Sequence, residues 1–248
     1  MAISPAAQAI DQGRPHYEVL SRIEDENGKI LSPEKFIPAA EKLGLAVPVD
    51  MFVVKHTLAL LKKYPGHANN LSLCSINLSG ASVSNERMAG FIEHQLQLNE
   101  IDPRTICFEV TETHEILDND TATNLVDRLR AKGCKFAFDD FGTGHSNYQS
   151  FSRLPVDIVK IDGSYVRHIL DDKQLRTDVE GIINSAKVRG LEIVAEYAEN
   201  KEIVAELKRL GADYAQGYHF SKPIPLETVI RESNSLPSRT EFWEDLPQ

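Results

Sequence analysis

Cysteine is scarce in this chain, and its three residues form no motif. Cys74, Cys107 and Cys134 lie far apart in apolar stretches, and no C-x-x-C pair occurs. Zinc-thiolate sites and disulfide frameworks need paired or closely spaced cysteines, so neither is expected to organise this fold. We expect three reduced thiols that pack in the core as small hydrophobic side chains.

Long hydrophobic runs and an excess of basic residues are also absent. The most apolar stretch, Met51–Leu61, is interrupted by Lys55 and His56, whereas a membrane span needs roughly 20 apolar residues. The N-terminus has no charged region followed by an apolar one, so no export signal is predicted. The 27 Lys and Arg against 37 Asp and Glu give a formal net charge of −10, which argues against a polyanion binder. We expect a cytoplasmic chain without a membrane segment.

Short β-branched and apolar runs alternate with helical patterns along the whole chain. The predicted strands are Tyr17–Ile23, Leu71–Leu78, Thr105–Val110, Cys134–Asp139, Asp157–Ile161, Leu191–Glu196 and Tyr214–His219. The predicted helices are Pro38–Leu43, Met51–Lys63 capped by Asp50, Asn85–Leu98 capped by Ser84, Thr121–Lys132, Asn147–Leu154, Gln174–Arg189, and Lys201–Leu210 capped by Asn200. No linker divides the chain, so we expect one domain over residues 1–248 with a polar tail at 234–248.

Alternating strands and helices are typical of a parallel sheet, since each crossover returns the chain to the same strand direction. About 250 residues of such units suit a (β/α)8 barrel. Because seven strands are counted, we expect a TIM-like barrel that lacks its first strand in this chain. Polar residues lie at or near most strand ends, which meet on one face of such a barrel. They are Glu18, Arg22, Asn77, Glu109, Asp139, Asp140, Lys160, Asp162, Glu196 and Gln216.

Six of these residues are carboxylates, and like charges gathered at one rim repel unless a cation holds them together. Hard divalent cations with oxygen ligands are the simplest solution, and the Asn77 amide supplies a neutral oxygen. No histidine pair has zinc-ligand spacing, so Mg²⁺ or Mn²⁺ is favoured over zinc. The adjacent Asp139 and Asp140 are placed to serve two ions, and paired cations suit in-line attack of an activated water at phosphorus.

The residues also carry a resemblance that spans nearly the whole chain. Eight segments occur in the order and spacing of one family: YEVLSR, FIPAAEKLGL, INLS, FEVTE, DDFGTGHSN, LPVDIVKID, IVAEYAEN and QGYHFSKPIP. The sequence resembles the EAL-domain cyclic-di-GMP phosphodiesterases of bacterial signalling, which cut one phosphodiester of the cyclic dinucleotide to give linear pGpG. The resemblance implies a phosphodiesterase that uses two Mg²⁺ or Mn²⁺ ions.

The resemblance also implies a role for each matching residue. The implied metal-binding residues are Glu18, Asn77, Glu109, Asp139, Asp140 and Asp162. The implied substrate-binding residues are Leu20, Arg22, Glu199 and Gln216. Glu196 would bind an ion or accept the proton of the attacking water, and Lys160 would orient that water or offset charge on phosphorus. Glu112 would anchor the DDFGTG loop.

Three departures from the family pattern stand out. Val19 replaces the usual Ala of the signature, and Tyr197 stands where a Gly is common. Family members carry an apolar strand ending in Gln-Pro ahead of the signature, and Met1–Pro15 begins where that strand would end. We therefore expect residues 1–15 to be an N-terminal remnant that leaves a barrel edge unpaired.

Partners follow from the same resemblance. We expect cyclic di-GMP as the ligand, a homodimer, and upstream sensory or regulatory domains in a full-length bacterial protein, which is either cytoplasmic or membrane-bound with this domain in the cytoplasm. The apolar stripe Val179, Ile182, Ile183 and Ala186 forms the dimer face or packs on the barrel. Two other functions remain open: a module that binds cyclic di-GMP without cutting it, and a Schiff-base lyase that uses Lys160.

Overall fold

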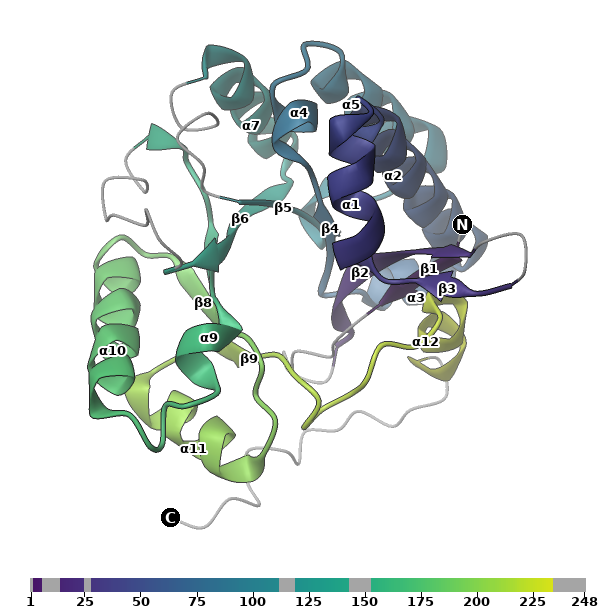
Figure 1. The fold of residues 1–248 in the computed structure, drawn as a ribbon. Coiled ribbons are helices and arrows are strands. Elements are labelled where there is room, and N and C mark those ends of the chain that lie inside the picture. Colours follow the sequence, from purple (N-terminus) through teal and green to yellow (C-terminus); the bar gives the residue numbers. More distant parts are fainter. Residues whose placement is uncertain (1, 6–13, 25–27, 112–118, 143–152, 234–248) are drawn as a thin grey trace.

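A computed structural model describes residues 2–5, 14–24, 28–111, 119–142 and 153–233 of the chain (Figure 1). The strands are β1 Ala2–Pro5, β2 His16–Glu24, β3 Ile30–Leu31, β4 Leu73–Asn77, β5 Ile106–Thr111, β6 Lys135–Phe141, β7 Ile158–Ile161, β8 Glu192–Ala195 and β9 Tyr214–Ala215. The helices are α1 Pro33–Lys42, α2 Ala46–Lys63, α3 Pro65–Asn70, α4 Gly80–Val83, α5 Met88–Asn99, η1 Pro103–Thr105, α7 Asp120–Lys132, α9 Gly163–Val166, α10 Lys173–Val188, α11 Lys201–Leu210 and α12 Leu226–Ser233.

The strands form one curled sheet with helices on its outside (Figure 1). Its order is β1-β2-β4-β5-β6-β7-β8-β9, and the seven strands from β2 to β9 on this path are parallel. These are the seven predicted strands, although β9 ends at Ala215 instead of His219. The predicted TIM-like α/β architecture is therefore confirmed.

The N-terminal segment differs from the expectation of an unpaired edge. Ala2–Pro5 pairs antiparallel with the second half of β2, from Ala2 opposite Arg22 to Pro5 opposite Val19. No parallel strand precedes β2 in the described residues, but the edge of β2 is covered by this short antiparallel strand. Backbone pairing of β1 thus satisfies donors and acceptors that the sequence analysis left exposed.

Side chains, rather than a backbone ladder, join the last parallel strand to the first. Within the described residues no pairing of β9 with β2 occurs. The rings of His16 and Tyr214 meet edge to face with centroids 5.3 Å apart, and Gln216 Nε2 donates to Glu18 Oε2 at 2.8 Å. These two contacts define a seam between β2 and β9 that completes the ring.

Several helix ends follow local sequence signals. The Asn200 side chain accepts a hydrogen bond from the Ile203 N–H at the start of α11, and Gly211 ends that helix in the left-handed conformation. Gly133 ends α7 in the same way. The Asn200 cap and the ends of these helices at Leu210 and Lys132 match the predictions from sequence.

Other helix starts were predicted wrongly. Helix α2 begins at Ala46, so Asp50 lies inside it, and α5 begins at Met88 rather than at Asn85. Helix α1 begins at Pro33, because proline suits the first turn of a helix, and it continues through Pro38. The predicted helix Asn147–Leu154 lies largely outside the described residues.

The core lies between the sheet and its surrounding helices. Four phenylalanines are buried in this layer: Phe108, Phe136, Phe138 and Phe141. The stripe of α10, made of Val179, Ile182, Ile183 and Ala186, is buried in the same cluster. Of the two alternatives for this stripe, the structure shows packing on the barrel.

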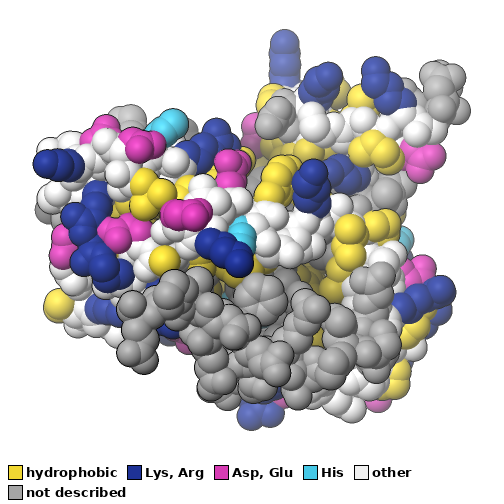
Figure 2. Space-filling view, turned by 90° about the horizontal axis from the view of Figure 1, so that it is seen from below, with side chains coloured by type: hydrophobic (Ala, Val, Ile, Leu, Met, Phe, Trp, Pro, Cys, Tyr) yellow, Lys and Arg dark blue, Asp and Glu magenta, His cyan; other side chains and the backbone are white. Residues whose placement is uncertain are grey.

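The three cysteines are buried with free thiols, as predicted. In the part of the chain that is described, no helix has the length and apolar character required to cross a bilayer. Figure 2, which views the molecule from below Figure 1, shows acidic and basic side chains next to one another on the described surface.

Candidate functional site

Two layers of side chains follow one another along the inner face of the sheet. The first layer is apolar and buried, and consists of Leu73, Cys107, Ala137, Ile158 and Val194. Side chains alternate between the two faces of a strand, so the residue two positions later points to the same side. That spacing gives a second, polar layer made of Ser75, Glu109, Asp139, Lys160 and Glu196. The strand period alone therefore gathers these groups at one level of the barrel.

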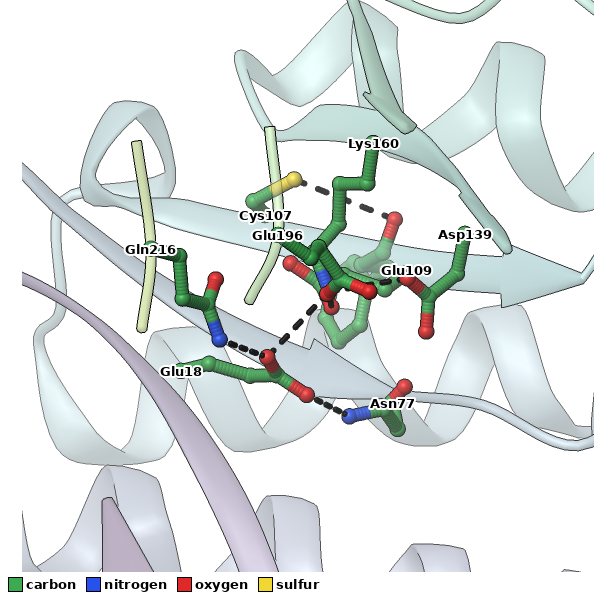
Figure 3. Close-up of polar contacts among 9 residues, drawn as sticks. Glu18, Asn77, Cys107, Glu109, Asp139, Lys160, Glu196 and Gln216 are labelled. Atoms are coloured by element: carbon green, nitrogen blue, oxygen red, sulfur yellow. Dashed lines mark hydrogen bonds and ion pairs between the residues drawn. The ribbon is translucent and has the colours of Figure 1, made fainter. Parts of the chain in front are cut away.

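Lys160 lies at the centre of this polar layer (Figure 3). Its Nζ is 2.6 Å from Glu109 Oε2, 2.8 Å from Asp139 Oδ1, 2.9 Å from Glu196 Oε1 and 3.2 Å from Glu18 Oε2. Only 2% of the lysine side chain is exposed, so these ion pairs form away from bulk water. Residues from β2, β5, β6, β7 and the end of β8 thus meet at one point.

Two amides hold the Glu18 carboxylate. Asn77 Nδ2 donates to Glu18 Oε1 at 2.7 Å, and Gln216 Nε2 donates to Glu18 Oε2 at 2.8 Å. The place of Gln216 depends on Gly217, because a Cβ at position 217 would lie 2.4 Å from the backbone N and O of Ala198. The Ala198 N–H in turn donates to the Gln216 carbonyl at 2.9 Å. This close approach of two chain segments directs Gln216 toward Glu18.

One ammonium group cannot satisfy four carboxylates. A protonated lysine has three N–H donors, and Lys160 makes hydrogen bonds to Glu18 and Glu109. Asp139 Oδ1 lies within ion-pair distance of Lys160, yet this buried oxygen accepts no well-directed hydrogen bond from the described residues. The site therefore keeps unused capacity to bind a cation.

Burial and mutual charge shift the pKa values of the central groups in different directions. Burial and the nearby Glu18 raise the pKa of Glu109 well above its ordinary value. Burial alone would raise the pKa of Glu18, but Lys160 and the two amides lower it. Burial alone would lower the pKa of Lys160, but Asp139, Glu109 and Glu18 raise it. Lys160 is therefore a permanent cation at neutral pH.

A cluster of carboxylates suited to a metal ion lies beside Lys160. One oxygen from each of Asp139, Asp140 and Glu196 lies within 4.8 Å of the others. With all five carboxylates of the site ionised, the one ammonium would leave a formal charge of −4, which two divalent cations would neutralise. All the donors are oxygens, which suit hard divalent cations. The residues present therefore fit the predicted cofactor.

The backbone at Asp140 departs from regular strand geometry. By strand alternation this residue would face away from Asp139, but its φ is +54° and the β6–β7 register shifts between Phe138 and Phe141. Such an irregularity re-aims a side chain. Burial, then the charges of Asp139 and Asp162, raise the pKa of Asp140 to about 6. The bulge therefore explains how two consecutive aspartates both reach the cluster.

An aromatic side chain of α9 holds the backbone at Gly142, two residues after Asp140. The Tyr165 hydroxyl donates to the Gly142 carbonyl at 2.6 Å, and a Cβ at position 142 would lie 2.6 Å from the Tyr165 ring. Asp162 begins α9 as its N-cap and accepts from the Ser164 N–H at 2.9 Å. In this structure Asp162 thus acts as a helix cap next to the carboxylate cluster, and its support of a second ion stays a prediction.

The remaining predicted residues lie outside the central cluster. Leu20 and Arg22 are half-buried on β2, where Arg22 Nη1 donates to the Ser21 carbonyl at 2.9 Å. Glu199 is exposed beyond the end of β8. Their substrate contacts stay predictions, and Glu112 lies outside the described residues.

Sequence reasoning missed the structural role of Asp50. Its Oδ2 accepts from the Ser79 N–H at 2.8 Å and from the Ser79 and Ser82 hydroxyls at 2.6 Å each. These bonds fix α2 to the turn that follows Asn77. The only local signal was a carboxylate near a predicted helix start, which equally describes a cap.

The pKa shifts predict how pH controls cation binding. Burial and the charge of Asp139 among others raise the pKa of Glu196 to about 7, and that of Asp140 is about 6. The folded chain binds both protons more tightly than the unfolded chain, so the stability that these groups contribute is greatest below roughly pH 4 and falls as the pH rises through 6 and 7. A cation needs the ionised carboxylates.

We therefore expect Mn²⁺ to raise the melting temperature more at about pH 8 than at about pH 5. Thermal unfolding of the chelator-treated chain, with and without Mn²⁺ at each pH, measures this difference. An equal increase at the two pH values would contradict the assignment of Asp140 and Glu196 to the cation site.

Comparison with known protein families identifies the family to which this chain belongs. The EAL domain model matches residues 2–223. The chain belongs to the EAL domain family. Similar curated proteins include cyclic di-GMP phosphodiesterase PdeF of Escherichia coli K12, 35% identical over 225 residues that cover 89% of this chain and 30% of that protein. Cyclic di-GMP phosphodiesterase PdeB of Shewanella oneidensis is 38% identical over 223 residues, or 88% of this chain and 26% of that protein. This chain spans less than a third of either relative.

Solved structures of EAL domains have the same fold. The PaMucR phosphodiesterase in complex with c-di-GMP superimposes with a TM-score of 0.83 at 26% identity, covering 92% of this chain and 93% of that one. The EAL enzyme Bd1971 with cAMP and cyclic di-GMP bound gives a TM-score of 0.86 at 26% identity, covering 94% of this chain and 64% of that one. The EAL resemblance inferred from the sequence motifs is thus confirmed.

Proposed function

We propose that this EAL domain hydrolyses cyclic di-GMP to linear pGpG with two Mg²⁺ or Mn²⁺ ions. The observation that carries the proposal is the convergence of four carboxylates from separate strands around one buried lysine, with the Asp140 carboxylate beside two of them. Relatives named as cyclic di-GMP phosphodiesterases, and a related domain solved with c-di-GMP, support the choice of substrate.

Asp139, Asp140 and Glu196 would form the main cation-binding group, with oxygens of Glu18 and Glu109 nearby. Asn77 uses its amide nitrogen to bind Glu18, which leaves its carbonyl oxygen available as a neutral ligand. When bound, the cations supply positive charge beside the phosphate and make a neighbouring water more acidic.

Glu196 would either bind an ion or accept the proton of the attacking water. Without a bound cation, burial raises the pKa of Glu196 to about 7, close to the pH at which a general base works best. Water oxygen forms a bond to phosphorus, the bond from phosphorus to the leaving sugar oxygen breaks, and that oxygen takes up a proton. The Lys160 ammonium stays protonated and opposes the negative charge that gathers on the phosphate oxygens.

A Schiff-base function for Lys160 is disfavoured. A lysine that attacks a carbonyl must lose its proton, and four carboxylates within ion-pair distance hold the proton on this one. The alternative of a binding module without turnover uses the same residues and is separated from catalysis by experiment. A homodimer, upstream regulatory domains and a cytoplasmic location stay predictions.

Product analysis with a chelator tests the proposal. The chain is incubated with cyclic di-GMP and Mn²⁺, and nucleotides are separated by chromatography. We expect linear pGpG with Mn²⁺, none after EDTA, and recovery when excess Mn²⁺ is restored. Binding of cyclic di-GMP without any linear product would replace the phosphodiesterase with the receptor function.

A further inference from the structure

Tyr197 stands in a backbone conformation that an aromatic residue rarely adopts. It follows Glu196 directly, and its φ is +54°, in the left-handed region where glycine is favoured. Among the described residues that are not glycine, positive φ occurs at Glu100 and Asp140 as well. A strained conformation persists only where surrounding contacts fix it, so the contacts of Tyr197 need a structural explanation.

The ring of Tyr197 packs on α9. A Cβ added at Gly163 would lie 1.9 Å from Cδ2 and 2.5 Å from Cγ of the ring, so only glycine at position 163 allows this contact. The guanidinium carbon of Arg167 lies 3.9 Å from the ring centroid, a cation–π distance. Gly163 and Arg167 are four residues apart and lie on one face of the helical turn. Tyr197 thus contacts both ends of α9.

This contact joins the two strand ends that carry Lys160 and Glu196. Helix α9 begins three residues after Lys160, and the Glu196 N–H donates to the Ile161 carbonyl at 3.1 Å. The Ala198 N–H, on the other side of Tyr197, donates to the Gln216 carbonyl. The Glu196 backbone is therefore fixed to β7 by one hydrogen bond and to α9 by the aromatic ring of the next residue.

We propose that Tyr197 is a positioning residue that keeps the Glu196 carboxylate within reach of Asp139 and Asp140, and so sets how tightly the site binds a divalent cation. The inference rests on the proposed metal-dependent function. Its physical basis is anchoring: the ring packs on Gly163 and fixes the turn to α9, whereas a glycine at position 197 would adopt the same φ without strain but leave the turn free to move.

Mn²⁺ binding to the chelator-treated chain tests this without substrate. The fraction of free Mn²⁺ is followed by electron paramagnetic resonance for Tyr197→Gly, Tyr197→Phe, Gly163→Ala and the double variant Gly163→Ala/Tyr197→Gly. We expect Tyr197→Gly to weaken binding by about 10-fold, the size typical of residues that orient a metal ligand. Tyr197→Phe retains the ring and should bind as the unsubstituted chain does. Gly163→Ala should weaken binding alone but add nothing in the double variant, where no ring remains to displace.

Two matched controls separate positioning from general effects. Glu100→Gly relieves the same kind of left-handed strain at the end of α5, and Gly90→Ala adds a methyl group that meets its nearest neighbour at 4.0 Å. Neither should change Mn²⁺ affinity. Thermal unfolding without metal identifies the variants that fold.

Several outcomes would overturn the inference. The first is a Mn²⁺ affinity of Tyr197→Gly equal to that of the unsubstituted chain. The second is a raised KM of Tyr197→Gly with unchanged kcat and unchanged Mn²⁺ affinity, which would make the ring a substrate contact. The third is absence of Mn²⁺ binding by the unsubstituted chain. If the unsubstituted chain binds Mn²⁺ but forms no pGpG, the proposed hydrolysis fails while the Mn²⁺ titrations still decide the role of Tyr197.

Discussion

Asp139→Asn is expected to reduce cyclic di-GMP hydrolysis by about 10³-fold, because losing one cation-binding carboxylate removes about 4 kcal/mol of transition-state stabilisation. The stability of the fold without metal should not decrease. Asp139 contributes charge to a site whose carboxylates already outnumber its single ammonium, and its Oδ1 accepts no directed hydrogen bond from any residue that the structure describes. Metal-free stability should therefore stay the same or rise.

The test is specific because Asp139→Asn should lower turnover without lowering metal-free stability. Turnover is measured with saturating Mn²⁺, and the free energy of unfolding is measured with EDTA. Asp171→Asn serves as the matched control, since it removes an exposed carboxylate on the same barrel. Full hydrolysis by Asp139→Asn, or loss of activity that only mirrors unfolding, would contradict the proposed role.

Lys160→Met is expected to destabilise the chain by about 3–5 kcal/mol at neutral pH, because it leaves buried carboxylates without their cation. Methionine matches the length of the lysine stem, so the loss reports charge rather than volume. Mn²⁺ should restore part of the stability by taking over the same carboxylates. Denaturant unfolding with EDTA and with Mn²⁺ measures both effects.

The pH dependence of the Lys160→Met variant identifies the cause. Without the ammonium, buried carboxylates such as Glu109 hold protons more tightly, and protonation removes their repulsion. The destabilisation should therefore be smaller at about pH 5 than at about pH 8. Lys135→Met, which breaks the partly exposed pair with Glu192, should cost about 0–1 kcal/mol. Similar losses in the two variants would show that the buried charges do not control stability.

Strand periodicity made most of the site predictable. Glu109 follows Cys107 by two residues, and Lys160 follows Ile158 by two, so each polar group faces the same side as an apolar inner residue. The parallel alternation of elements then brings those strands together. Neither step needs tertiary information, and the pairing of β5 with β6 and of β6 with β7 brings these strands side by side.

Contacts between distant segments could not be predicted in this way. Lys160 donates a hydrogen bond to Glu18, which lies 142 residues earlier. One lysine can pair with four carboxylates only because the curled sheet brings their strands around it. Asp50 has the sequence features of a helix cap, but the serines after β4 compete successfully for its carboxylate. The contact of Tyr197 with Gly163 likewise depends on the register between β7 and β8.

The seam between β2 and β9 has a consequence for interpreting variants. One of its two contacts is the hydrogen bond from Gln216 to Glu18, so a carboxylate of the proposed reaction centre also helps to close the architecture. A substitution at Glu18 would alter chemistry and ring closure together, and a loss of turnover there would have two inseparable origins. Asp139, which takes no part in that closure, is the position where chemistry alone can be measured.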